Sequence, residues 1–194
     1  MSTGIGNFSS ISASAENWAR GATQPDQMVP SEAYRNVTAT PEFMIKIDGV
    51  DTKSTLENFT DHVQLFHFNY RISRLTNPNA ADQLYTSARV VIEDPVMVIP
   101  NGNFAPIILN KLMKGDKIET IHIARLANIA QINVVVQELT FTNNYFQTYE
   151  PKYDTVVVTF RPATIENKIN SYDQGGTNTG STSVKFDFTT GQLV

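Results

Sequence analysis

The stretch Phe43-Met-Ile-Lys-Ile-Asp-Gly-Val50 indicates the fold class of this 194-residue chain. Its odd-numbered residues from 43 to 47 are apolar, and the even-numbered residues, Lys46 among them, point the other way. A period of two is that of a β-strand with one apolar face. Asp48-Gly49 then provides the residues that a tight turn prefers. The stretch therefore predicts a half-buried strand that ends in a turn.

Outward from this strand, the same period recurs along most of the chain. Further strands are predicted near residues 62–71, 85–92, 117–125, 131–142, 155–161, 163–169 and 183–187. Pro95 interrupts an apolar run over residues 90–99 and predicts an edge or a kink there. Residues 75–83 are expected to form a polar loop. Residues 171–182, rich in Gly, Asn, Thr and Ser, are expected to form a mobile loop of a long hairpin.

One helix is predicted, over residues 103–114. Asn103 is the candidate N-cap, and Pro106 falls in the first turn, where proline is tolerated. Ile108 and Leu112 belong to an apolar stripe at helical spacing. Gly115 follows the helix as a residue that readily adopts the left-handed conformation. Seven or eight mostly antiparallel strands and one helix predict a mainly β fold, closed into an antiparallel barrel of two packed sheets.

The amino-acid composition of the chain excludes several classes of function. Charged residues make up 18% of the chain, below the roughly 25% of typical soluble domains, which suits a subunit that buries surface against neighbours. The net charge of −4 gives no basic footprint for nucleic acid and argues against a membrane-surface role. The absence of cysteine excludes disulfides and thiol chemistry. We expect neither a signal peptide at the first residues nor a transmembrane helix.

The sequence contains no pattern typical of catalysis or metal binding. His62 and His67 are five residues apart and so face opposite sides of a strand, and His122 lies between two isoleucines. Adjacent carboxylates such as Glu93 and Asp94 also point apart on a strand. No zinc-protease, nucleophile-elbow or phosphate-loop motif occurs. We therefore predict no catalytic residues, no cofactor and no metal, and we interpret the histidines as surface or interface residues.

Taken in order, these features resemble the Hcp (haemolysin-coregulated protein) family of type VI secretion tube subunits. The family core opens with F-I-K-I-D-G-I/V, which residues 43–50 match, and an E/K-S-T loop follows, which residues 51–55 echo. Residues 62–65 fit the histidine-containing entry to the next strand. The helix end K-x-x-x-G-K is similar to residues 109–117, and the strand A-T-L-T-V-R-K to residues 119–125. The resemblance covers about three quarters of the chain.

The resemblance implies a fold of the Hcp and phage tail-tube type and a structural role rather than an enzymatic one. Family members form hexameric rings that stack into a hollow tube, which a contracting sheath expels and which carries effectors. The implied partners are further copies of the chain, spike, sheath and baseplate proteins, and effector cargo, with no nucleic acid and no membrane insertion. The implied location is the cytoplasm during assembly and the outside or a target cell after secretion.

The resemblance also divides the chain into two parts. Residues 42–194 correspond to the tube domain, and residues 1–41 are an N-terminal extension. The extension is either a disordered tail or an arm that packs on a neighbouring subunit. Candidate ring and stacking residues lie in the first turn, in the polar loop and in the arm: Asp48, Gly49, Asp51, Lys53, Ser54, Asn77, Pro78, Asn79 and Trp18.

Three alternatives stay open from the sequence. The first is the tail-tube protein of a related phage-like contractile injection system, because such proteins share the general fold. A monomeric ligand-binding β-barrel predicts a monomer with a closed apolar pocket. An enzyme on a barrel scaffold is the third class, although no motif supports it.

Overall fold

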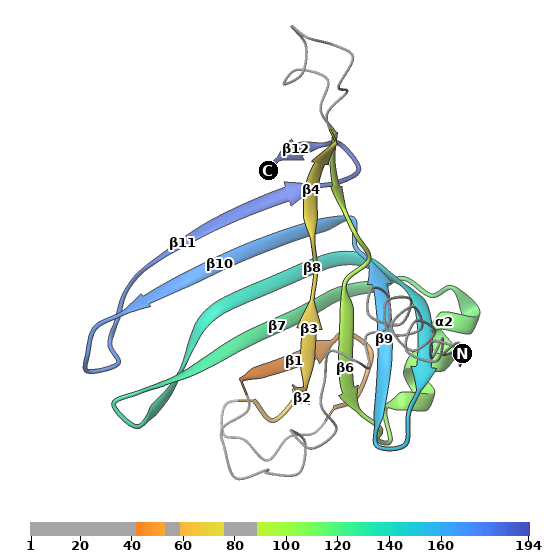
Figure 1. Ribbon diagram of the computed structural model, residues 1–194, viewed down its shortest axis with the longest axis horizontal. Coiled ribbons are helices and arrows are strands. Elements are labelled where there is room, and N and C mark those ends of the chain that lie inside the picture. Colours follow the sequence, from red (N-terminus) through yellow and green to blue (C-terminus); the bar gives the residue numbers. More distant parts are fainter. Residues whose placement is uncertain (1–41, 53–58, 76–88) are drawn as a thin grey trace, which may run out of the picture. The chain divides into compact units, whose positions relative to one another are not determined.

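The computed structural model describes residues 42–52, 59–75 and 89–194 (Figure 1). Predictions that fall on residues 1–41, 53–58 and 76–88 lie outside the described residues. The described elements, in chain order, are β1 (Phe43–Ile47), β2 (Val63–Leu65), β3 (His67–Asn69), β4 (Ile72–Leu75), β5 (Arg89–Ile92), β6 (Val96–Pro100), α2 (Ala105–Lys114), β7 (Ile118–Ile129), β8 (Ile132–Pro151), β9 (Thr155–Arg161), β10 (Thr164–Tyr172), β11 (Asn178–Asp187) and β12 (Gln192–Leu193).

The strands form two antiparallel sheets that share β8. Sheet A has the order β12-β11-β10-β8-β7-β1-β2, and sheet B the order β3-β6-β9-β8. The first part of β8 pairs with β7 and β10, whereas its last residues, from Tyr145 onward, pair with β9. β4 and β5 form a separate hairpin. The predicted mainly β, antiparallel architecture with one helix is confirmed for the described residues.

The predicted closed barrel is not shown. Residues 62–71, expected to be one strand, are divided among β2, β3 and the approach to β4. β2 pairs with β1 in sheet A, and β3 pairs with β6 in sheet B. Phe66 lies between these two short strands as a bend, and its amide donates to the Val98 carbonyl at 2.8 Å. The chain therefore passes from one sheet to the other at Phe66.

Strands β7 and β8 are longer than predicted. They form a hairpin around Ala130 and Gln131, both of which have positive φ. Asn143 also has a positive φ of 53°, which marks an irregularity at which the strand continues instead of ending. The buried Asn144 amide donates to the carbonyls of Ile118 and Phe141 and so satisfies backbone groups there. These local hydrogen bonds allow β8 to run through two polar residues.

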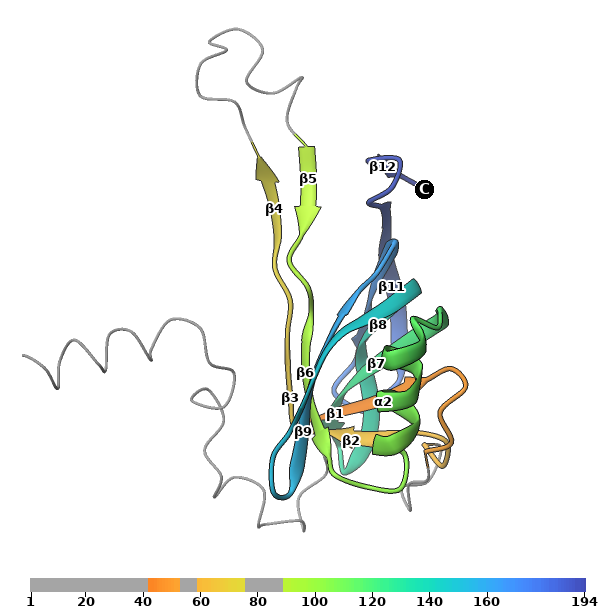
Figure 2. The same ribbon diagram turned by 90° about the vertical axis from the view of Figure 1, so that its right-hand side faces the viewer.

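The core lies between the two sheets and is closed at one side by α2 (Figure 2). Phe141 of β8 is fully buried at its centre. Its ring makes edge contacts with Phe160 of β9, at 5.2 Å between centroids, and with Phe68 of β3, at 5.9 Å. Ile108 of α2 is also fully buried and belongs to the same cluster. One continuous apolar cluster therefore holds both sheets and the helix together.

The helix begins later than predicted. Phe104, not Asn103, is the N-cap residue, and it makes no side-chain capping bond. The turn is set instead by the Ala105 amide, which donates to the Gly102 carbonyl at 2.9 Å. At the other end Gly115 adopts the predicted left-handed conformation, with φ 69°. Its amide and that of Asp116 close the helix with hydrogen bonds to carbonyls of the last turn.

The predicted hairpin of the last strands is confirmed, but its loop is much shorter than predicted. β10 and β11 pair from Thr164 with Asp187 to Tyr172 with Asn178. The expected loop over residues 171–182 is therefore mostly strand. Asp173 accepts hydrogen bonds from the amides of Gly175 and Thr177 and so closes the short turn.

No helix within the described ranges has the length and apolar character needed to span a membrane.

Candidate assembly surface

The outer edge of sheet A lies along β11. Within the described residues β11 pairs with β10 over its whole length, but β12 covers only Phe186 and Asp187 on the other side. Residues 178–184 are exposed. The Lys185 carbonyl accepts from the Val194 amide, so it points away from β10. Since backbone groups of alternate residues point the same way in a strand, those of Ser181 and Ser183 also point to this free edge.

This edge is irregular only near its start, where the register of β11 with β10 shifts between residues 178 and 180. Residues 178–184 read Asn-Thr-Gly-Ser-Thr-Ser-Val and contain no charged residue and no proline. Exposed strand edges invite pairing with other chains, and proteins usually block them with charges, prolines or bulges. β10 and β11 also extend beside β7 and β8, past the strands of sheet B (Figure 1). The edge of β11 is therefore open to a further strand.

A second free edge lies at the opposite side of sheet A. β1 pairs with β7 from Ile121 to Arg125, and the Leu126 amide donates to the Glu42 carbonyl. The last residues of β7, 127–129, pair only with β8 within the described part of the chain. Within the described residues, sheet A thus offers a long edge along β11 and a short edge at residues 127–129 on the opposite side.

The β4–β5 hairpin leads into residues 76–88. Its register pairs Ile72 with Ile92, and Arg71 and Glu93 beside it form an ion pair at 3.4 Å. Two-stranded hairpins are only marginally stable alone. At its base Asp94 binds Arg161 of β9 through two hydrogen bonds, at 2.8 and 3.0 Å. This contact raises the pKa of Arg161 and ties the base of the hairpin to sheet B.

The turn after β1 is the described part of the predicted stacking surface. Asp48 and Asp51 are exposed, and Gly49 has a φ of 68°. A side chain at Gly49 would meet the Lys111 ammonium of α2 at 2.9 Å. The turn is therefore accessible, and Gly49 lies close to the Lys111 side chain of α2.

The remaining predicted interface residues lie outside the described residues: Lys53, Ser54, Asn77, Pro78, Asn79 and Trp18. The sequence interpretation predicted only residues 183–187 of β11 as strand and assigned residues 178–182 to a loop, because Gly and Asn are poor strand formers. The available signal was the β-branched Thr182, which extends the period of two of Val184 and Phe186 toward the start of the strand.

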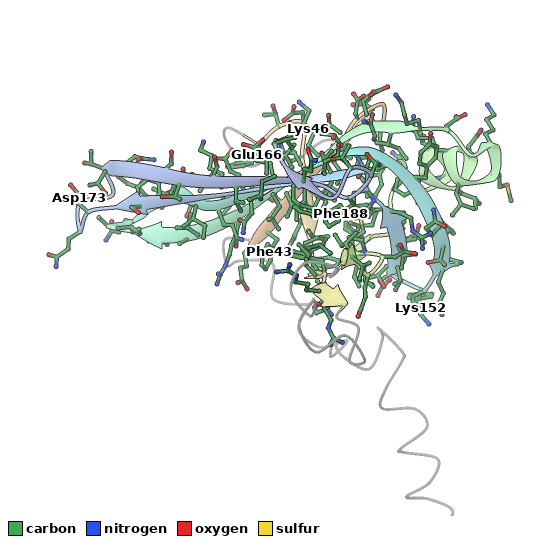
Figure 3. All side chains as sticks on the ribbon, turned by 90° about the horizontal axis from the view of Figure 1, so that it is seen from above. Phe43, Lys46, Lys152, Glu166, Asp173 and Phe188 are labelled. Carbon is green, nitrogen blue, oxygen red and sulfur yellow. The ribbon has the colours of Figure 1, made fainter. Side chains whose placement is uncertain are left out.

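Sheet A has a polar face opposite the core, defined here by Lys46, His122, Glu138, Glu166, Lys168 and Lys185. Direct cross-strand pairs place these residues on one side of the sheet. Figure 3 shows Lys46 and Glu166 on this side and Phe43 and Phe188 on the other. Lys168 binds Glu138 at 3.0 Å, and this contact raises the pKa of the Lys168 ammonium.

Residues 59–62 fold over part of the polar face. Asp61 forms an ion pair with Lys46, which is the main reason that the pKa of Asp61 is lowered to about 2. The Thr52 hydroxyl donates to the Asp61 carbonyl at 2.6 Å. His62 is buried, and this burial lowers the pKa of its imidazole. Within the described ranges, no group of three or more histidine or acidic residues is placed to hold a metal ion.

Comparison with known proteins defines the fold. No family model matches the sequence, and no curated protein matches it. Among solved structures, one described as a type six secretion system protein has a TM-score of 0.71 at 13% identity, over 80% of this chain and 100% of its own. Hcp1 from Salmonella typhimurium has a TM-score of 0.63 at 15% identity, over 78% and 97%. A type VI secretion system effector from Yersinia pestis has a TM-score of 0.57 at 14% identity, over 75% and 98%.

The fold is therefore of the class found in type VI secretion proteins. More particularly, the fold is Hcp-like, because 97% of the Hcp1 chain aligns with this one. The resemblance inferred from residues 43–50 and the elements after them is confirmed at the level of the fold.

Proposed function

We propose that this chain is a structural subunit of a type VI secretion inner tube. Subunits close into hexameric rings, and the rings stack into a hollow tube that sheath contraction expels with effector cargo. Assembly takes place in the cytoplasm, with spike, sheath and baseplate proteins as partners. The role is structural and requires no catalysis. The Hcp-like fold supports the class of protein, and the free edge of β11 is the observation that carries the self-assembly.

Two free edges of sheet A support the proposed ring formation. A ring needs a heterologous contact in which one surface of a subunit meets a different surface of the next. The long edge of β11 and the short edge at residues 127–129 of β7 are two such surfaces on opposite sides of one sheet. Backbone pairing between them would satisfy groups that otherwise invite uncontrolled association. Six subunits per ring is the number that the Hcp resemblance implies.

Within each subunit, the two sheets close into a barrel. Two observations support this part of the proposal: β8 belongs to both sheets, and the chain bends at Phe66 from β2 of sheet A into β3 of sheet B. The sheets are thus joined covalently at both of these places.

A proline at Ser183 tests the ring contact. The backbone amide of Ser183 points to the free edge, so Ser183→Pro leaves the pairing with β10 intact, and edge strands tolerate proline. Ser183→Ala is the matched control, because it keeps the amide. In sizing and negative-stain images, wild type and Ser183→Ala should give rings about 100 Å wide, whereas Ser183→Pro should give folded monomers.

Each outcome has a distinct meaning. Rings from Ser183→Pro would exclude the β11 edge as the ring contact. A wild-type monomer at high concentration would contradict the tube proposal and favour a ligand-binding barrel.

Stacking is assigned to the turn after β1, the β4–β5 hairpin with residues 76–88, and the N-terminal extension. Deletion of residues 1–41 should leave single rings intact and shorten the tubes if the extension bridges subunits. Tubes of unchanged length would show that the extension has no role in stacking.

A further inference from the structure

Two histidines that are 60 residues apart in sequence meet on the polar face of sheet A. The rings of His62 and His122 are 5.9 Å apart between centroids, at an interplanar angle of 78°. The Phe59 ring contacts His62 from another side, at 5.1 Å. The His62 amide donates to the Phe59 carbonyl at 3.0 Å, so residues 59–62 form a closed turn. The histidine contact is thus where this turn meets β7.

Each histidine also contacts a carboxylate that a lysine already neutralises. His62 Nδ1 lies 2.7 Å from Asp61 Oδ1, and Asp61 also binds Lys46. On the other side, His122 Nε2 lies 3.5 Å from Glu138 Oε2. Glu138 also binds Lys168 and accepts a hydrogen bond from the Asn170 amide.

The charges of the polar face balance only while both histidines are neutral. Lys46 offsets Asp61, and Lys168 offsets Glu138. The next charged pair along the face, Glu166 with Lys185, is directly paired across β10 and β11 and adds no net charge. Protonation of both histidines would therefore leave two positive charges in this group of described residues.

Protonation of His62 would also create a buried donor. His62 Nε2 is buried and has no hydrogen-bond partner within the described residues. In the neutral ring, Nδ1 donates to Asp61 and Nε2 carries only a lone pair. In the charged ring, Nε2 carries a proton and has no acceptor among the described residues, which is costly for a buried group. The second charge, 5.9 Å away on His122, would add repulsion.

We propose that the His62–His122 contact is a proton-operated latch, which holds residues 59–62 against β7 at neutral pH and releases them when both imidazoles are protonated. The released segment includes the Asp61 carbonyl that anchors Thr52, and Thr52 is buried just after the β1 turn. Acidification would therefore loosen the connection between β1 and β2. The latch is a property of the single chain and does not depend on ring formation.

The sign of the pH dependence follows from the burial of His62. Burial lowers the pKa of His62 in the folded chain. The unfolded chain therefore binds more protons once the pH falls below about 6.5, and stability decreases from there as the pH is lowered.

Hydrogen exchange of the full chain tests the latch. Protection of the amides of residues 59–65, corrected for the intrinsic rate, should fall about tenfold or more between about pH 7.5 and about pH 5. His122→Gln keeps a neutral polar side chain that cannot be protonated. Between the same two pH values, the logarithm of the amide protection of residues 59–65 should fall in this variant by less than about half of its fall in the wild type. His67→Gln is the matched control, because His67 is half-buried on β3 and its pKa is also lowered by burial, yet it is not part of the contact.

A variant-free measurement accompanies this test. In the NMR titration of the wild-type imidazoles, protonation of His62 should coincide with the loss of protection of residues 59–65. Equal pH responses in wild type and His122→Gln would overturn the proposal, as would unchanged protection in wild type while His62 titrates.

Discussion

Replacement of Phe141 by leucine tests whether the aromatic cluster holds the two sheets together. Phe141 belongs to β8 and is fully buried. Its ring meets Phe160 at 5.2 Å, Phe68 at 5.9 Å and Tyr70 at 6.1 Å, all edge-on. Phe160 and Phe68 belong to strands of sheet B, and Tyr70 directly follows β3. Leucine keeps most of the apolar volume but removes all three ring contacts.

The expected cost follows from these contacts. An aromatic pair contributes about 0.5–1.5 kcal/mol beyond area burial, so three pairs give an upper range of roughly 1.5–4.5 kcal/mol. Neighbouring side chains relax around a leucine, so we expect a loss of about 2–3 kcal/mol in the free energy of unfolding. For a chain of this size, this lowers Tm by roughly 4–12 °C.

Urea unfolding followed by circular dichroism measures the change, at a concentration at which the chain is monomeric. Tyr153→Leu is the control, because it makes nearly the same replacement at a side chain that is 95% exposed. This variant should stay within about 0.5 kcal/mol of wild type. The double variant with Phe160→Leu should show a coupling energy of about 0.5–1.5 kcal/mol.

A small effect would refute this reasoning. If Phe141→Leu and Tyr153→Leu cost the same, the ring contacts across the sheets do not stabilise the fold. If the double variant is strictly additive, the Phe141–Phe160 contact has no energy of its own.

Further predictions concern the β1 turn and its polar neighbours. Gly49→Ala and Gly115→Ala both place a side chain at a φ near 68–69° and should each cost about 1–2 kcal/mol in urea unfolding. The two costs should agree within about 0.5 kcal/mol, because the atom that the new side chain at Gly49 would meet is the ammonium end of the flexible Lys111 side chain. A clearly larger cost for Gly49→Ala would show that Lys111 cannot move aside. Asp61 has a pKa lowered from 3.8 to about 2, so its stabilising effect should persist above pH 3.8 and disappear as the pH falls toward 2. Asp61→Asn should abolish this acid step in thermal melts and also shift the protonation of His62 to lower pH, because the carboxylate raises the pKa of that imidazole. An unchanged His62 titration in this variant would contradict the assigned contact.

Parts of the fold that depend on local patterns could be predicted from the sequence. The alternation in residues 43–47 and the Asp48-Gly49 turn correspond to β1 and its turn, and residues 155–161 coincide with β9. Gly115 ends the helix as predicted. In these segments, side-chain period and backbone preference act within a few residues and agree with the final structure.

The candidate assembly surface could be predicted only in part. The turn at Asp48 and Gly49 was identified because turn residues are recognisable locally. The free edge of β11 was missed, since an edge is defined by the absence of a neighbour in the sheet and not by the residues of the strand. The meeting of His62 with His122 was likewise hidden, because it depends on pairing of β1 with both β2 and β7.

The sequence by itself determined that this protein is mainly β, that its strands have one apolar face, and that one helix ends at Gly115. Only the tertiary structure decided that β8 continues through Asn143 and serves two sheets, and that the chain changes sheet at Phe66. The physical reason is the range of the forces involved. Periodicity and turn preference act between neighbours in sequence, whereas strand partners, free edges and the contact of two distant histidines arise from burial of one shared core.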